Sequence, residues 1–146
     1  MKERIREKTK LLARMVQEAM LEAFHMLHQN TVDIQAIRNR QLAIVHTGKT
    51  IEKQYGENEA IEALLGIAST LDTLAEKETA CEILVVYIDL LEAALDAWND
   101  PTEKMQRKAE KQAARARSFE NQMDRNERAV LHRILAETQT LSASRQ

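Results

Sequence analysis

Apolar and polar residues alternate along most of the chain with the spacing of α-helices. In the first segment, small or apolar residues recur from Ile5 to Met26 at steps of three and four, which places them on one face of a helix. The same spacing returns in the segments that follow. Gly56 is suited to end one helix, and Asn58 to begin the next. The pattern predicts helices over residues 2–29, 31–55, 58–77, 79–98 and 101–141.

Capping residues set two of these boundaries. Asn30 is suited to the N-cap of the second helix, with Asp33 in its first turn. Asp100 is suited to cap the last helix, and Pro101 to take its first position, where its missing N–H is not needed. Both starts are therefore predicted from single residues.

The last helix is too long for its neighbours. A helix over 101–141 would extend about 60 Å, against about 30 Å for each of the two helices before it. Three arrangements resolve this: the helix protrudes, it breaks near 118–121, or it pairs with a third and fourth helix fused into one rod. We favour protrusion or a break, and we expect residues 142–146 to fray.

Composition supports an all-α fold. The 146 residues are 44% apolar and 30% charged, yet only 3% are aromatic, with three glycines and one proline. Most β folds need more turn formers and more aromatic or β-branched residues, and disordered chains contain fewer large aliphatic ones. We therefore predict an all-α bundle of about five helices with a long C-terminal helix, in one domain over 1–146.

Cysteine usage and hydropathy bear on the compartment. Cys81 is the single cysteine, so it has no intramolecular disulfide partner, and this favours a reducing cytoplasm. The longest apolar run, Ile83–Ile88, falls far short of the about 20 residues of a membrane span. The basic N-terminus is not followed by a continuous apolar segment, unlike a secretory signal. We expect a cytoplasmic protein without membrane contact.

The net charge of −2 conceals a segregated layout. Residues 1–51 carry nine basic and five acidic side chains, residues 52–100 two and twelve, and residues 101–146 ten and six. The middle of the chain is therefore strongly acidic, whereas both ends are basic.

A dense basic stretch lies near the start of the last predicted helix and contains a single interior acid, Glu110. Its members are Lys104, Arg107, Lys108, Lys111, Arg115 and Arg117. They could form an interface for nucleic acid or an acidic protein surface. They could equally lie against the acidic segment of the same chain or of a second copy. We favour the latter, because the whole chain is not basic and no aromatic residues are interleaved to stack bases.

His46 lies in a second candidate site. On a helical projection it falls opposite the apolar stripe of the second helix, so we expect it to be exposed. His46, Lys49, Thr50 and Gly56 are spaced in outline as in histidine phosphotransfer domains, and the segment resembles that motif over about eleven residues. The resemblance implies a helical bundle in which His46 accepts a phosphoryl group and Lys49 offsets its charge.

A metal site is not expected. Glu22 and His25 have the Glu-x-x-His spacing of carboxylate-bridged metal bundles, but that chemistry needs a second such pair. Neither His46 nor His132 has a glutamate three residues before it. Because no arrangement of nucleophile and base is recognisable by spacing, we predict no enzyme activity, no metal and no cofactor.

The methionines have two interpretations: ordinary core filling, which we favour for any single one, and a surface that adapts to irregular protein partners. The chain has six, five of them in the terminal helices: Met15, Met20, Met26, Met105 and Met123. We expect a non-enzymatic helical adaptor, chaperone-like or assembly protein that binds a protein partner or a second copy. The alternatives are a nucleic-acid-binding accessory subunit that uses the basic helix 104–117, and a histidine phosphotransfer-like domain with His46 as phosphoacceptor.

Overall fold

The computed structural model describes residues 2–76 and 81–144, which are helical apart from short connections and include no strand. The elements are α1 (Lys2–His28), α2 (Ile34–Tyr55), α3 (Glu59–Ala68), α4 (Leu71–Glu76), α5 (Cys81–Asn99), α6 (Glu103–Arg117), the 3₁₀ turn η1 (Glu120–Gln122) and α7 (Arg125–Ala143). The predicted all-α fold is confirmed. The expectation of about five helices is close, because two of the predicted segments are each divided.

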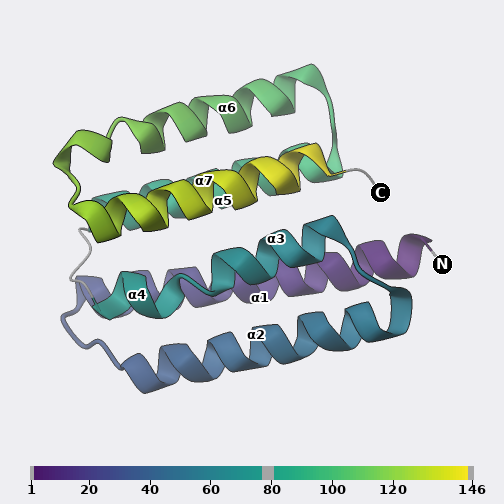
Figure 1. Cartoon of the computed structure of the whole chain (residues 1–146), viewed down its shortest axis with the longest axis horizontal. Coiled ribbons are helices and arrows are strands. Elements are labelled where there is room, and N and C mark those ends of the chain that lie inside the picture. The colour runs from purple at the N-terminus through teal and green to yellow at the C-terminus, as the bar shows by residue number, and fades with distance from the viewer. Residues whose placement is uncertain (1, 77–80, 145–146) are drawn as a thin grey trace.

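The helices stack side by side between two outer edges, as Figure 1 shows. α2 forms one edge and contacts α1, α3 and α4. α5 and α7 lie beyond these, with α7 packed on α3 and α5. α6 forms the opposite edge and packs mainly on α5.

α3 is buried almost completely, and it lies at the centre of the core. Eight of its ten residues are buried, because apolar or small residues occupy nearly every side of the helix. Leu12 on α1, Ile61 on α3 and Leu84 on α5 are each 0% exposed. The core therefore runs through the bundle from α2 to α5, whereas α6 buries only Ala109 and Ala116.

The start of α2 differs from the prediction. Asn30 is not the N-cap; it has a positive φ of 55°, a conformation that asparagine tolerates better than most residues. It turns the chain away from α1. Asp33 caps the helix instead, and its carboxylate accepts a hydrogen bond from the backbone N–H of Ala36 at 3.1 Å. At the other end, Gly56 with φ of 93° ends α2 and Asn58 caps α3, as predicted.

The segment predicted as the third helix is divided at residues 69 and 70. The Ser69 hydroxyl donates to the backbone carbonyl of Gly66 at 2.6 Å, and the Thr70 hydroxyl donates to that of Ile67 at 2.7 Å. These bonds satisfy carbonyl groups at the end of α3. The predicted boundaries at 77 and 79, and with them the question of a fused third and fourth helix, fall outside the described residues.

The segment predicted as one helix over 101–141 breaks, which is one of the two favoured outcomes. α6 ends at Arg117, and α7 begins after the N-cap Asp124. Asp124 and Glu127 form a capping box, in which each side chain accepts from the other's backbone N–H. The break reverses the chain, so that α6 and α7 both pack on α5.

Both ends of that segment also differ from the prediction. α6 starts at Glu103, and its N-cap is Thr102 rather than Asp100, because the Thr102 hydroxyl accepts from the backbone N–H of Met105. Pro101 therefore precedes the helix. At the far end, α7 continues to Ala143, and Gln106 of α6 donates to the carbonyl of Ser142 at 3.0 Å. Residues 142 and 143 are thus helical and not frayed, while 145 and 146 lie outside the described residues.

Burial of α3 should dominate stability. Leu64 is 0% exposed, so Leu64→Ala should lower the free energy of unfolding by about 2–5 kcal/mol, through lost burial and the cavity left behind. Leu42 on α2 is 67% exposed, and Leu42→Ala provides the control with the same chemical change. Urea denaturation of the two variants measures the difference. Equal destabilisation by both would contradict this account of the core.

Candidate functional site

The basic stretch of α6 is partly engaged by acidic residues of α5. The Lys108 ammonium lies 3.1 Å from an Asp96 carboxylate oxygen, and the Arg115 guanidinium lies 3.0 Å from one of Asp89. Arg107 pairs with Glu103 within α6 itself. Three members of the stretch form no ion pair with any described residue: Lys104, Lys111 and Arg117.

Small side chains mediate the packing of α6 on α5. Ala109 of α6 meets Ala93 and Ala97 of α5, with Met105 half-buried beside them. Alanines let the two helices approach closely, but they bury little apolar area. The ion pairs to α5 are partly exposed, and such pairs contribute about 0–1 kcal/mol each. The exposed side of α6 therefore keeps Lys104, Lys111 and Arg117 as cations in water, beside the Arg107–Glu103 pair.

His46 is exposed on the outer face of α2, as its predicted position requires. Lys49, one turn further on, lies between two carboxylates: its ammonium is 3.8 Å from Glu52 and 3.9 Å from Glu62. The charge of Lys49 is thus already offset by this chain. Phosphotransfer at His46 stays a prediction.

Gly48 fits a close helix contact. It is buried where α2 crosses α3, and an added Cβ would come within 2.7 Å of the Leu65 side chain. A glycine at this position lets the two helices approach closely. Glycine is a poor helix former, and the contact with α3 explains why one occurs inside α2, two residues after His46.

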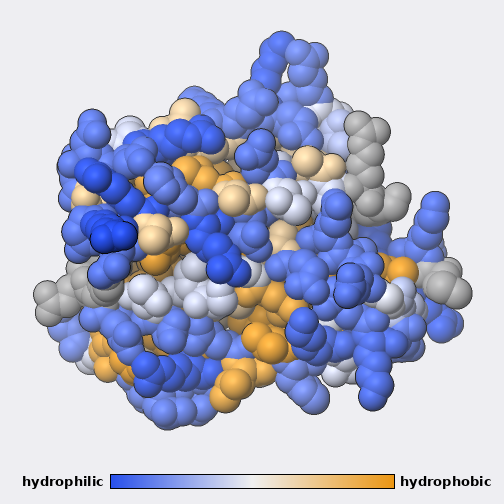
Figure 2. Space-filling model, in the orientation of Figure 1, coloured by the Kyte–Doolittle hydropathy of each residue, from blue (hydrophilic) through white to orange (hydrophobic). Residues whose placement is uncertain are grey.

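A groove runs over α3 between α2 and α7, and we call it the α3 groove. It consists of two adjoining open depressions of about 380 and 450 Å³, which share Glu62 and Glu137. Ala63, Leu65 and Gly66 form its floor, and its walls come from α2 and α7: Val45, Lys49, Arg133 and Thr140. In Figure 2, apolar atoms reach the surface along the boundary of α2 with α3. The groove thus combines an apolar floor with charged walls.

Two carboxylates lie side by side at the edge of the α3 groove, and one of them, Glu62, lines it. The Glu52 side chain is only 8% exposed, and it lies beside Glu62, which is 50% exposed. Burial raises the pKa of Glu52, and hydrogen bonding with the Glu62 carboxyl raises it further. The backbone N–H of Asn58 donates to Glu52 at 3.3 Å and acts in the opposite direction. The positive charge of Lys49 lowers this pKa as well, but burial and Glu62 outweigh both contacts, so the net pKa of Glu52 is raised.

Glu137 lies directly over the floor of the α3 groove. Its carboxylate covers Gly66 so closely that an added Cβ at this glycine would overlap it. Partial burial raises the pKa of Glu137, Arg133 lowers it, and the negative charge of Glu62 raises it again. No described residue forms an ion pair with Glu137. A carboxylate that Arg133 compensates only in part thus lies over the floor of the α3 groove.

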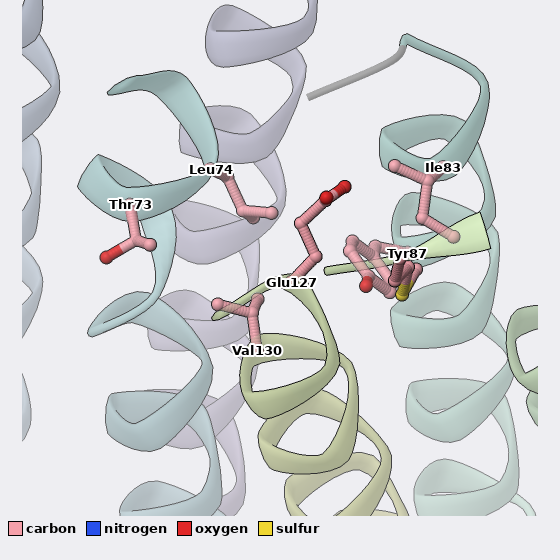
Figure 3. A pocket seen from close by; sticks show the side chains of 7 residues that line it. Thr73, Leu74, Ile83, Tyr87, Glu127 and Val130 are labelled. Carbon is pink, nitrogen blue, oxygen red and sulfur yellow. The ribbon is translucent and has the colours of Figure 1, made fainter. Parts of the chain in front are cut away.

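A second pocket lies between α4, α5 and α7, and Figure 3 shows Leu74, Tyr87 and Glu127 around it. Its interior measures about 10 Å³, which is about the space of one water molecule. Burial and the negative charge of Glu127 raise the pKa of Tyr87 well above its ordinary value, so its hydroxyl stays protonated. The pocket does not accommodate a substrate in this conformation.

The spacing of Glu22 and His25 does not produce a metal centre within the described residues, where no three His, Cys, Asp or Glu side chains are grouped to hold an ion. Glu22 pairs instead with Arg40 of α2. The His28 ring stacks on the ring of Phe24, and the His25 ring meets it edge to face. Among the described helices, none is long and apolar enough to span a bilayer.

Sequence reasoning missed the α3 groove. Its parts are far apart in the chain, with Val45, Glu62 and Glu137 on three different helices. Two signals point toward it: the acidic excess of residues 52–100, and Gly66 inside an otherwise apolar helix. Comparison of the chain with protein-family models, curated proteins and solved structures found no match.

The raised pKa of Glu52 predicts that the stability of the fold depends on pH. The folded protein holds the Glu52 proton more tightly than the unfolded chain, so stability falls as pH rises from 4.5 through the folded pKa. Glu52→Gln should therefore raise the urea midpoint at pH 7, and this gain should shrink below pH 4.5. Glu57→Gln, at an exposed site nearby, is the control. A lower midpoint for Glu52→Gln at pH 7 would show that a charged Glu52 stabilises the fold.

Proposed function

We propose that the protein is a non-enzymatic helical adaptor or assembly protein, and that it acts through protein–protein contacts made at the α3 groove. The observation that carries the proposal is the open groove itself, with a floor of Ala63, Leu65 and Gly66. The floor offers apolar surface to a partner, the Glu137 carboxylate lies over Gly66, and two flanking helices provide walls. Grooves of this kind accept an amphipathic helix.

Exposed apolar side chains beside the groove support this proposal. Leu42 is 67% exposed and Val45 is 38% exposed, one turn apart on α2. Single exposed aliphatic residues are ordinary on protein surfaces. Here, however, Val45 also lines the groove, so a partner seated there would cover it.

Site-specific cross-linking tests the proposed function. A photoreactive amino acid at Val45 should capture one defined protein in the native host, either this chain or another. The matched control places the probe at Ala43, which is exposed on the same helix but does not line the groove. We expect a yield at Val45 several times that at Ala43. Equal yields at the two positions would refute a docking role for the groove.

A nucleic-acid-binding role is the second candidate, and the unpaired Lys104, Lys111 and Arg117 favour it. If these residues contact phosphates, the double variant Lys104→Gln/Lys111→Gln should reduce the slope of log K against log salt by about 2. Fluorescence anisotropy with labelled duplex and single-stranded oligonucleotides measures this slope. No binding by the unaltered protein at about 0.05 M salt would eliminate the candidate.

A further inference from the structure

We propose that the α3 groove binds the basic outer face of α6 from a second copy of this chain, so that copies associate head to tail. The inference rests on the proposed function, because it names the partner that occupies the same groove. Three observations carry it: the charge of the groove, the charge and shape of α6, and the places of both on the molecule.

The α3 groove is acidic and lacks enough cations of its own. Its lining includes four glutamates, Glu57, Glu59, Glu62 and Glu137, against Lys49 and Arg133. Lys49 is also shared with Glu52. The α3 groove therefore has an apolar floor and more carboxylates than cations around it. A helix with cationic side chains would offset this excess of negative charge.

The outer face of α6 has the complementary character. Ala109 and Ala116 mark the buried side of the helix, and Lys104 and Lys111 lie on the far side, one above the other. Lys108 and Arg115 lie on the flank between them, where they pair with Asp96 and Asp89 of α5. Lys104 and Lys111 lack an ion-pair partner among the described residues, so they are available to a second copy. The aliphatic stems of these lysines can cover Val45 while their ammonium groups reach the carboxylates.

A single molecule does not bring these two surfaces together. α6 packs mainly on α5 at one edge of the bundle, and the groove lies over α3 between α2 and α7 (Figure 1). The contact therefore joins two different surfaces of two copies. Repeated contacts of this heterologous kind produce a ring where the rotation closes and a filament where it does not.

Neutral variants test the inference without reversing any charge at a helix terminus. The groove variant is Glu62→Gln/Glu137→Gln, and the α6 variant is Lys104→Gln/Lys111→Gln. Glutamine keeps the shape of glutamate, and both lysines are exposed, so circular dichroism should show unchanged helices. The control is Glu7→Gln/Glu18→Gln, two exposed sites on α1 with the same change of charge as the groove variant.

Sedimentation velocity over a range of protein concentrations gives the readout. The unaltered chain should associate at about 0.01 M salt and dissociate toward 16.7 kDa at about 1 M, where the Debye length is about 3 Å. Each double variant should weaken association about tenfold, as expected for the loss of two partly exposed ion pairs. The control should behave like the unaltered chain.

Mixing the two double variants gives the most specific result. Each retains one intact surface, so the mixture should form a 1:1 dimer with one strong contact, although neither variant associates strongly alone. A monomer of 16.7 kDa at every concentration and salt, or full association of both variants, would overturn the inference. If the chain stays monomeric while the Val45 probe captures a different protein, the proposed function stands and the second copy is excluded as its partner.

Discussion

Close packing of α3 against its neighbours is the constraint on which the rest of the structure depends. This short helix is buried on nearly every side and contacts α1, α2 and α7. Glycine makes the approach of α2 feasible, because Gly48 brings its backbone against Leu65. The recessed position of α3 then leaves a groove between the larger helices beside it. Core packing and the candidate site therefore have one origin.

Tertiary packing also determines which charges remain uncompensated. Asp89 and Asp96 of α5 lie close to Arg115 and Lys108 of α6, so part of the acidic middle segment is neutralised within the chain. The four glutamates that line the α3 groove face only two cations, Lys49 and Arg133. The small net charge of the whole chain is thus distributed as an acidic groove on one surface and a basic helix on another, which is the pattern expected of complementary interfaces.

The attachment of α6 differs from that of the other helices. It buries two alanines, whereas α3, α5 and α7 contribute large aliphatic side chains to the core. A helix held by little apolar area adds little to stability, so its sequence is less constrained by the core. Its basic side chains are held in place mainly by charge, through the pairs of Lys108 and Arg115 with α5 and of Arg107 with Glu103. This difference links the fold to the proposed function.

The sequence by itself determined the helical class, most helix positions, and the caps at Gly56 and Asn58. Periodicity and capping are local, since they depend on residues within one or two turns. Where two residues near a helix start could each act as the N-cap, the sequence did not distinguish them. Asp33 caps α2 in place of the expected Asn30, and Thr102 caps α6 in place of the expected Asp100. Only the tertiary structure decided that the last segment reverses before α7, which cations of α6 meet α5, and that three distant helices form a groove. These features depend on contacts between residues far apart in the chain, which no local pattern specifies.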